Sequence, residues 1–242
     1  MTVALSLALA AIGLALVSAL VLRSVGSGLR IGRLLAGTRM VDIGEAMRLA
    51  TTDPSRYVRV TGRISSDEEF PDDQNRPLVF RRTRLEIKGS GEGTWQSIFD
   101  EREAVPFGIE SRSDYIGIDD VALADGMVVI PRISLGVVSE LPADYATDVP
   151  AGTDPATPAR LTIEQLSAVE HATAVGRVTL REGVPTLTAG TNRPLIVTTL
   201  DQAAAMRLLA RGKRQRVVAG AVGFAVALGL LAGAIAAFVV GI

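Results

Sequence analysis

The chain has 242 residues, 48% of them hydrophobic, and its 25 Lys and Arg residues almost balance 26 Asp and Glu residues. It contains no cysteine and a single histidine. This excludes disulfides, thiolate-bound zinc, iron–sulfur clusters, thiol nucleophiles and histidine-rich metal sites within the chain. We therefore predict no metal and no cofactor.

Both ends of the chain are predicted to be transmembrane helices, at residues 1–22 and 217–242. Residues 2–22 and 217–242 contain no charged side chain, and each is long enough to cross a hydrocarbon core roughly 30 Å thick. The first is predicted to remain as an anchor, because its apolar run is longer than that of a signal peptide and no A-x-A cleavage site lies directly before Arg23.

The basic residues near these two segments all lie on the side of the intervening chain. They form a basic collar: Arg23, Arg30, Arg33, Arg39, Arg207, Arg211, Lys213, Arg214 and Arg216. Basic residues close to a span are retained in the cytoplasm. The predicted localisation is therefore the cell membrane, as a multi-pass protein with a cytoplasmic domain and both termini outside.

The collar and the rest of the chain have opposite charges. The collar attracts anionic lipid head groups, at about 1 kcal/mol per residue near the surface, so membrane lipids are predicted partners. Apart from these nine residues, the chain contains 16 basic and 26 acidic residues. An acidic domain of this kind argues against nucleic acid as a partner.

The first part of the predicted domain is mainly β. Residues 23–40 form a basic, Gly-rich juxtamembrane segment, expected to be flexible or interfacial, and residues 41–51 have the spacing of a short amphipathic helix. Strands begin near Arg56, where Val58 and Val60 alternate with polar residues. Further strands are expected at 78–87, 95–99, 105–109, 115–118, 127–131 and 135–139. Residues 41–140 are therefore predicted to be a first β unit with short turns.

A Pro-rich segment at 141–160 is predicted to be a linker or a long surface excursion. A helix is expected at 161–169, with Thr162 as its N-cap. Strands at 172–180, 186–187 and 195–198 complete a second β unit, residues 161–198. Residues 199–216 are predicted to be a basic cytoplasmic helix that continues into the second span, since Thr199 and Gln202 have the spacing of a capping box.

The two predicted β units share a sequence pattern. Residues 60–64 read VTGRI and precede Asn-Arg-Pro at 75–77, while residues 174–178 read AVGRV and precede Asn-Arg-Pro at 192–194. The predicted fold class is thus mainly β, as two related antiparallel β units or two halves of one barrel, plus short helices, flanked by two transmembrane helices. Chance matching of common strand residues is the alternative explanation.

The same residues carry a resemblance to a known family. The contributing features are the strand ending in Gly62, the strand at 79–83 with its arginines, Trp95, the acid-rich approach to 105–107, and the runs 175–178 and 194–199. Together with the two flanking spans they resemble the GIDE domain, also called BAM ("beside a membrane"), of the MULAN-type RING E3 ubiquitin ligases. The resemblance implies a membrane protein related to ubiquitin transferases.

This chain departs from that family in two respects. The ligases place a zinc-binding RING after the second span, whereas this chain stops at Ile242 and has no cysteine. We therefore expect no ligase activity from the chain alone. The organelle members also keep this domain on the side away from the cytosol, opposite to the placement that the arginines predict.

No residue set in the sequence predicts a reaction. The carboxylates Asp100, Glu101 and Glu103, and the pair Asp119-Asp120, are able in principle to perform acid–base hydrolysis. Neighbouring arginines at 81, 82, 84 and 102 favour ordinary surface ion pairs instead. His171 is expected to be structural or exposed. The Gly-rich run 89–93 lacks phosphate-binding spacing and is expected to be a turn. We predict no catalytic, cofactor-binding or metal-binding residues.

The predicted spans carry small residues at helical spacing. The ridge on the second span consists of Ala221, Ala225, Gly229, Gly233 and Ala237, and that on the first consists of Ala11, Ala15 and Ser18 or Ala19. Such ridges let helices approach closely. They predict packing of one span on the other, or self-association with a second copy. The alternative is that such spans are simply rich in Ala and Gly.

Three functions are compatible with these features. The first is a non-enzymatic, membrane-tethered β domain that binds a protein or supports an assembly at the cytoplasmic face. The second is a ligase-related protein that depends on a partner for catalysis. The third is a β module that binds lipid or a small ligand at the membrane surface, which a closed apolar pocket would favour.

Overall fold

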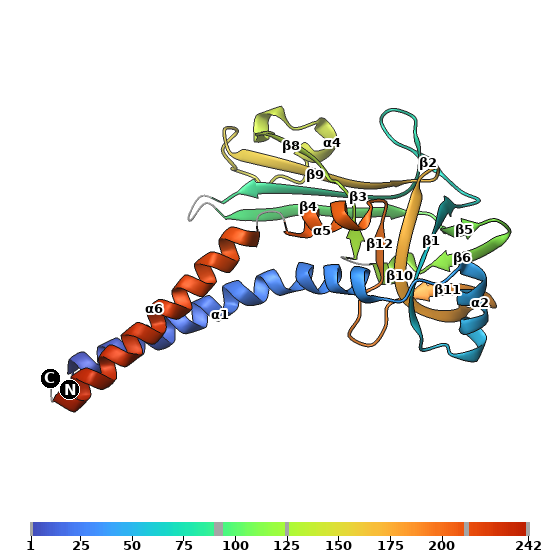
Figure 1. Cartoon of the computed structure of the whole chain (residues 1–242). Coiled ribbons are helices and arrows are strands. Elements are labelled where there is room, and N and C mark those ends of the chain that lie inside the picture. The colour runs from blue at the N-terminus through green and yellow to red at the C-terminus, as the bar shows by residue number, and fades with distance from the viewer. Residues whose placement is uncertain (1, 90–93, 124–125, 211–212, 241–242) are drawn as a thin grey trace. The chain divides into compact units, whose positions relative to one another are not determined.

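The computed structural model describes residues 2–89, 94–123, 126–210 and 213–240 (Figure 1). They divide into two compact units, Met1–Ala36 with Gln202–Ile242, and Gly37–Asp201. We call the first the helical unit and the second the barrel unit. The chain is mainly β with short helices, as predicted, and every strand in the described ranges belongs to the barrel unit.

Five strands of the barrel unit close into a barrel. They are β1 (Tyr57–Ser65), β5 (Gly108–Ser111), β6 (Asp114–Ile118), β11 (Val184–Thr188) and β10 (His171–Arg181), in that order, and β10 pairs with β1 again. All neighbours are antiparallel except β6 and β11, which are parallel. This is the connectivity of the OB fold, a five-stranded Greek-key barrel. Two short strands, β12 (Ile196–Thr198) and β7 (Met127–Val128), extend the sheet beyond β10.

Alternation along the strands fills the barrel with aliphatic side chains. On β1, Val58, Val60 and Ile64 are almost fully buried and Gly62 is buried with them, while Arg59, Thr61 and Arg63 alternate on the other face. Helix α2 (Ile43–Thr52) adds Ile43 and other residues to the same core. Its first turn is held by Asp42, whose side chain accepts a hydrogen bond of 2.5 Å from the backbone N–H of Glu45. The helix predicted at 41–51 is thereby confirmed.

The two segments of the sequence repeat pair with each other in this barrel. Strands β1 and β10 are antiparallel and centre on the pair Val60–Ala174. Gly62 pairs with Ala172 and Gly176 pairs with Val58, so each glycine lies two positions from that centre, as a local two-fold axis requires. Both predicted β units therefore contribute to a single barrel.

A second sheet contains the long strands of the insertions between the barrel strands. Its members are β2 (Phe70–Pro71), β3 (Pro77–Lys88), β4 (Trp95–Ala104), β8 (Arg132–Val137) and β9 (Pro158–Ser167). Strand β3 lies between β9 on one edge and β2 and β4 on the other, and β8 follows β9. Short helical segments, α3 (Asp120–Leu123), a 3-10 turn (Val138–Glu140) and α4 (Ala143–Ala146), lie in the connections. The Pro-rich segment thus connects two paired strands, β8 and β9.

The helix predicted at 161–169 is wrong, because residues 161–167 belong to β9. The strand pairs with β3 on one side and with β8 on the other, and Leu161 is opposite both Leu85 and Ser134. Backbone pairing on both edges, together with the β-branched residues Thr162 and Ile163, outweighs the weak helical spacing of the apolar residues.

The helical unit contains α1 (Thr2–Gly37), α5 (Gln202–Ala210) and α6 (Lys213–Val240). Residues 23–40 are predicted to be flexible or interfacial; α1 continues to Gly37, so the flexible alternative is wrong as far as that residue. A Cβ atom at Gly32 would lie 2.7 Å from Sδ of Met206, so this glycine allows α1 and α5 to approach closely. The capping box predicted at Thr199 and Gln202 is wrong, because α5 begins at Gln202 and residues 199–201 are not helical. Continuity of this helix into α6 depends on residues 211–212, which lie outside the described residues.

Helices α1 and α6 run antiparallel (Figure 1). Small residues lie at their contact, where a Cβ atom at Gly223 would meet Ser18. Ala11 and Ser18 of α1 are buried, as the predicted ridge requires. The ridge predicted on α6 is wrong for this contact, because a Cβ atom added at Gly229 or at Gly233 would meet nothing within 4 Å. The buried face of α6 is formed by Gly220, Ala227 and Ala234 instead. These residues recur every seven positions, as do Ala11 and Ser18 on α1, and this heptad spacing suits the crossing of two nearly antiparallel helices better than a strict repeat of four.

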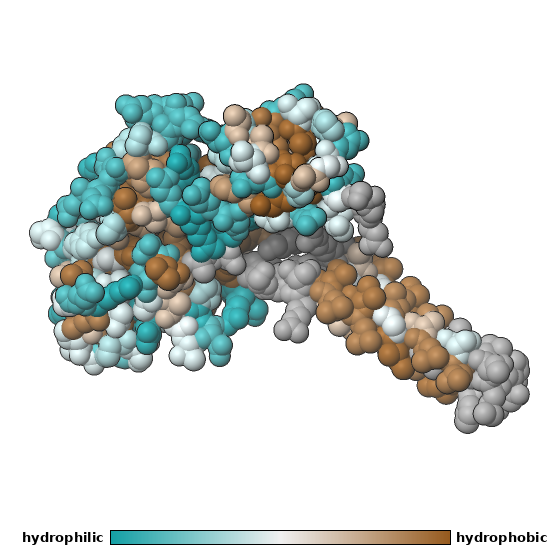
Figure 2. All heavy atoms as spheres, turned by 180° about the vertical axis from the view of Figure 1, so that it is seen from behind, coloured by the Kyte–Doolittle hydropathy of each residue, from teal (hydrophilic) through white to brown (hydrophobic). Residues whose placement is uncertain are grey.

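Large aliphatic side chains cover the outside of these two helices (Figure 2). Among the described residues, Val218–Ala236 of α6 is long and apolar enough to cross a membrane, and α1 contributes a shorter apolar stretch, Leu9–Val21.

Candidate functional site

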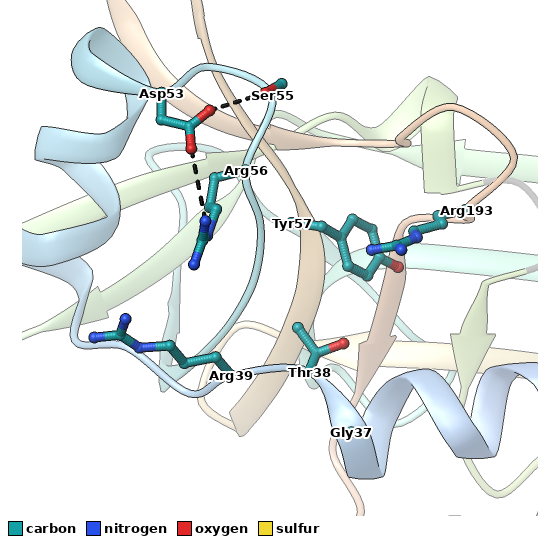
Figure 3. A pocket seen from close by; sticks show the side chains of 8 residues that line it. All are labelled: Gly37, Thr38, Arg39, Asp53, Ser55, Arg56, Tyr57 and Arg193. Atoms are coloured by element: carbon teal, nitrogen blue, oxygen red, sulfur yellow. Dashed lines mark hydrogen bonds and ion pairs between the residues drawn. The ribbon is translucent and has the colours of Figure 1, made fainter.

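A pocket of about 420 Å³ lies where several turns of the barrel unit meet at the start of β1 (Figure 3). Its lining comes from the chain just after α1, the turn after α2, the first residue of β1 and the turn before β12. The residues are Gly37, Thr38, Arg39, Asp53, Ser55, Arg56, Tyr57 and Arg193. The volume is in the range of small-ligand sites, but the lining is polar and basic rather than apolar.

Three arginines and one carboxylate set the charge of this pocket. Asp53 accepts a 2.8 Å hydrogen bond from Ser55 Oγ, and its other oxygen lies 3.8 Å from Nη1 of Arg56. Arg39 pairs at 3.0 Å with Glu45, which lies outside the lining, and its side chain is 66% exposed. The lining therefore carries an excess of positive charge.

Tyr57 is the centre of the pocket wall. Its hydroxyl donates a 2.5 Å hydrogen bond to the backbone oxygen of Pro194, which ties β1 to the Asn-Arg-Pro turn. The guanidinium of Arg193 lies over the Tyr57 ring, 5.4 Å from its centroid. Arg177 is opposite Tyr57 in the β1–β10 register. Its Nε is buried, with no hydrogen-bond partner in the part of the chain that the structure describes.

The first Asn-Arg-Pro turn, at 75–77, has a different electrostatic arrangement. Asp72 accepts hydrogen bonds from the backbone N–H of Arg76 at 2.8 Å and from its Nε at 2.7 Å, and its side chain is 1% exposed. Three contacts favour the charged form of Asp72: first the backbone hydrogen bond from Arg76, then the Arg76 side chain and the backbone N–H of Gln74. Together they outweigh burial, which alone would raise the pKa of this carboxyl. These contacts lower the pKa of Asp72 to about 2.

Asp72 predicts a pH dependence of stability. A carboxyl whose pKa is lower in the folded state stabilises the fold above its ordinary pKa of 3.8 and loses this contribution as pH falls toward 2. The free energy of unfolding should fall between pH 4 and about pH 2, and Asp72→Asn should flatten that part of the profile. Urea unfolding of the full chain in detergent, followed by fluorescence of Trp95, measures it. An unchanged acid slope in the variant would contradict the assignment.

A second surface feature is the exposed edge of the sheet at β8. Strand β8 is the last of its sheet and pairs on one edge only, with β9, among the described strands. Ile133 and Leu135 on this strand are 55% and 72% exposed, and Ile130 just before it is 72% exposed. An unpaired edge with apolar side chains is able to accept a further strand.

Three of the five carboxylates considered as acid–base candidates, Asp100, Glu103 and Asp119, make ion pairs with arginines in the structure. Asp100 receives hydrogen bonds of 2.8 and 2.7 Å from Arg82. These bonds, with the charge of Arg82, hold the pKa of Asp100 below its usual value despite partial burial. Glu103 pairs with Arg81 at 2.5 Å, and Asp119 pairs with Arg181 at 2.9 Å. The surface ion pairs favoured by the sequence are thus present.

The remaining candidates do not gather into a site. His171 is exposed at the start of β10, opposite Arg63. Of the Gly-rich run, residues 90–93 lie outside the described residues. Within the described ranges, no three His, Asp or Glu side chains lie close enough together to hold a metal ion.

No family model, no curated protein and no solved structure matches this chain. The resemblance to the GIDE domain therefore stays a prediction, and the function has to be argued from geometry. Sequence reasoning missed the arginine pocket, although the repeated Asn-Arg-Pro turn, which contains Arg193, was visible.

Proposed function

We propose that this chain is a membrane-anchored module that binds a protein partner or supports an assembly, without catalytic activity of its own. The supporting observation is the apolar outer surface of α1 and α6. The exposed large side chains on these helices include Leu5, Leu9, Leu16, Leu20, Val222, Leu228 and Ile235, each more than half exposed. An apolar surface of this extent is stable in lipid rather than in water, so both helices are proposed to be membrane-spanning anchors.

The proposed orientation follows from charge. The nine residues of the basic collar lie between the two apolar segments in the sequence, and none lies beyond them. Moving these arginines and the lysine through a bilayer is costly. The barrel unit is therefore proposed to lie in the cytoplasm, with both termini on the other side.

The β8 edge is the surface proposed to bind the partner, through an extended segment of the partner that adds to the sheet. Main-chain hydrogen bonds to the free edge supply affinity, and Ile133 and Leu135 supply apolar contacts on one face of the added strand. The partner strand should carry apolar residues at alternate positions, because successive side chains of a strand point to opposite faces.

Two observations favour a protein partner over nucleic acid or a substrate. OB folds bind single strands on the face of their second and third strands, which are β5 and β6 here. On β6, the pKa of Tyr115 is raised first by burial and then by the negative charges of Asp67 and Glu110. The same two carboxylates repel a polyanion from this face. The carboxylates described above are bound to arginines, as in structural ion pairs.

A cysteine-accessibility experiment tests both the orientation and the docking edge. The chain has no cysteine, so Leu135→Cys and the matched control Val121→Cys place single thiols at positions 72% and 76% exposed in the wild-type chain. In intact cells, neither should react with a membrane-impermeant maleimide. After gentle permeabilisation, the thiol at position 121 should react about tenfold faster than that at 135, because the partner covers β8. In purified protein the two rates should be alike.

The contrary outcomes are distinct. Labelling in intact cells contradicts the cytoplasmic placement of the barrel unit. Equal rates for the two thiols in permeabilised cells contradict binding at the β8 edge.

A further inference from the structure

We infer that the arginine pocket at the start of β1 is a binding site for a phosphate group, supplied by the head group of an anionic membrane lipid. The phosphate chemistry is argued from the pocket itself. The lipid as its source rests on the membrane anchoring proposed above.

The comparison of the two Asn-Arg-Pro turns shows that Arg193 is electrostatically unusual. In both turns the asparagine has a left-handed backbone, with φ of 59° at Asn75 and 55° at Asn192. In the first turn, Arg76 is neutralised by buried Asp72 at 2.6 Å. Three residues before Asn192 the sequence has Ala189 instead of an aspartate. The second turn therefore has no acid in the place of Asp72 to neutralise Arg193. The Arg193 side chain lines the pocket.

The remaining groups of the pocket suit a phosphate. Guanidinium groups bind phosphate oxygens with paired, charge-assisted hydrogen bonds. Arg39 and Arg56 add two such groups, and the hydroxyl of Thr38 is a further donor in the lining. The carboxylate of Asp53, the acidic group among the described lining residues, is already engaged with Ser55 and Arg56. Arg39 and Arg56 are each paired with one carboxylate, whereas Arg193 has no acid in its own turn. The donors of these side chains and of Thr38 suit the several oxygens of a phosphate monoester better than the two oxygens of a carboxylate.

The contacts of Tyr57 hold Arg193 in place for this role. The Tyr57 hydroxyl bonds to Pro194, directly after Arg193, and the ring stacks beneath the guanidinium. A Cβ atom at Gly190 would lie 3.4 Å from the Tyr57 ring and 3.6 Å from Cβ of Arg193, so the turn is closely packed around both. Gly37, the last residue of α1, lines the pocket, so the pocket directly follows in sequence a helix proposed to enter the membrane.

The test uses the full chain with a fluorophore on a cysteine at position 191, two residues before Arg193 (Thr191→Cys). In nanodiscs of phosphatidylcholine alone, glycerol phosphate should change the fluorescence in a saturable manner. Arg193→Gln should weaken this response about tenfold, the effect of losing a charge-assisted contact. The matched control Arg63→Gln removes one positive charge from an exposed side chain of β1 outside the pocket and should leave the affinity unchanged. Arg193→Lys, which keeps the charge, should fall between the two.

A second arm distinguishes the source of the phosphate. In nanodiscs that contain phosphatidic acid, the fluorescence should already be shifted, and glycerol phosphate should add little. A response to glycerol phosphate without any effect of phosphatidic acid would overturn the lipid as source and keep the phosphate site. Absence of any response, or equal weakening by Arg193→Gln and Arg63→Gln, would overturn the site itself. Neither result depends on the β8 edge, so failure here is separable from failure of partner binding.

Discussion

Gly62→Ala is expected to lower the free energy of unfolding of the barrel unit by about 2–3 kcal/mol, because the site has no room for a methyl group. A Cβ atom at Gly62 would lie 2.2 Å from the backbone oxygen of Glu110 and 2.8 Å from Cγ2 of Ile109. Both neighbours belong to β5, which pairs with the end of β1. A backbone atom cannot rotate away as a side chain does, so the added methyl must separate β1 from β5 and open the barrel.

Urea unfolding of the full chain in detergent, with Trp95 fluorescence as the signal, measures this loss. Gly89→Ala is a suitable control, since a Cβ atom there would have its nearest neighbour, the backbone oxygen of Thr94, at an ordinary 3.6 Å. The control should stay within about 1 kcal/mol of the parent. Equal midpoints for the Gly62 variant and the parent would show that the barrel closes less tightly than the structure indicates.

Gly223→Leu is expected to separate α1 from α6. A Cβ atom at Gly223 would lie 2.3 Å from Oγ of Ser18 and 3.9 Å from Cδ1 of Leu14, so a larger side chain occupies the space of the facing helix. Close approach of backbones is the main source of attraction between helices in lipid. We expect the helix contact to be lost, while both helices stay as apolar as the membrane anchoring proposed above requires.

Disulfide formation between Leu14→Cys and Ala227→Cys, each about one turn from the Ser18–Gly223 contact, reports on this packing. The pair should oxidise readily in the parent and at least about tenfold more slowly with Gly223→Leu. Gly229→Leu is the matched control, because a Cβ atom at Gly229 meets nothing within 4 Å. Loss of the disulfide in the Gly229 variant instead would favour the ridge predicted from the sequence over the face seen in the structure.

Several features of the fold were predictable because they depend on local patterns. The alternation of Val58 and Val60 with polar residues predicts a strand with one buried face, and β1 has that pattern of burial. The 3.6-residue period of Ile43, Met47 and Ala50 predicts α2. The absence of charge at both ends predicts apolar helices, and residues 2–22 of α1 and 217–240 of α6 are uncharged helical segments.

Other features depended on contacts that sequence patterns do not record. Whether 161–169 becomes helix or strand is decided by pairing with β3 and β8, which are distant in the sequence. The face that α6 buries is decided by the crossing of two helices, which selects Gly223 rather than Gly229. The arginine pocket combines Arg39, Arg56 and Arg193 from three separate turns, and no spacing rule connects them.

Residue counts and local patterns were enough to establish four features: no thiol chemistry, two apolar ends, a basic collar between them, and a mainly β domain with a repeated Gly and Asn-Arg-Pro pattern. These follow from counts and short periods along the chain. The pairing of the repeats about a two-fold axis in one closed barrel is visible only in three dimensions. The same holds for the different environments of the two repeated arginines, since Arg76 is neutralised by Asp72 while Arg193 lines a pocket. The physical reason is that strand pairing and charge compensation act between residues that are close in space, whatever their separation in sequence.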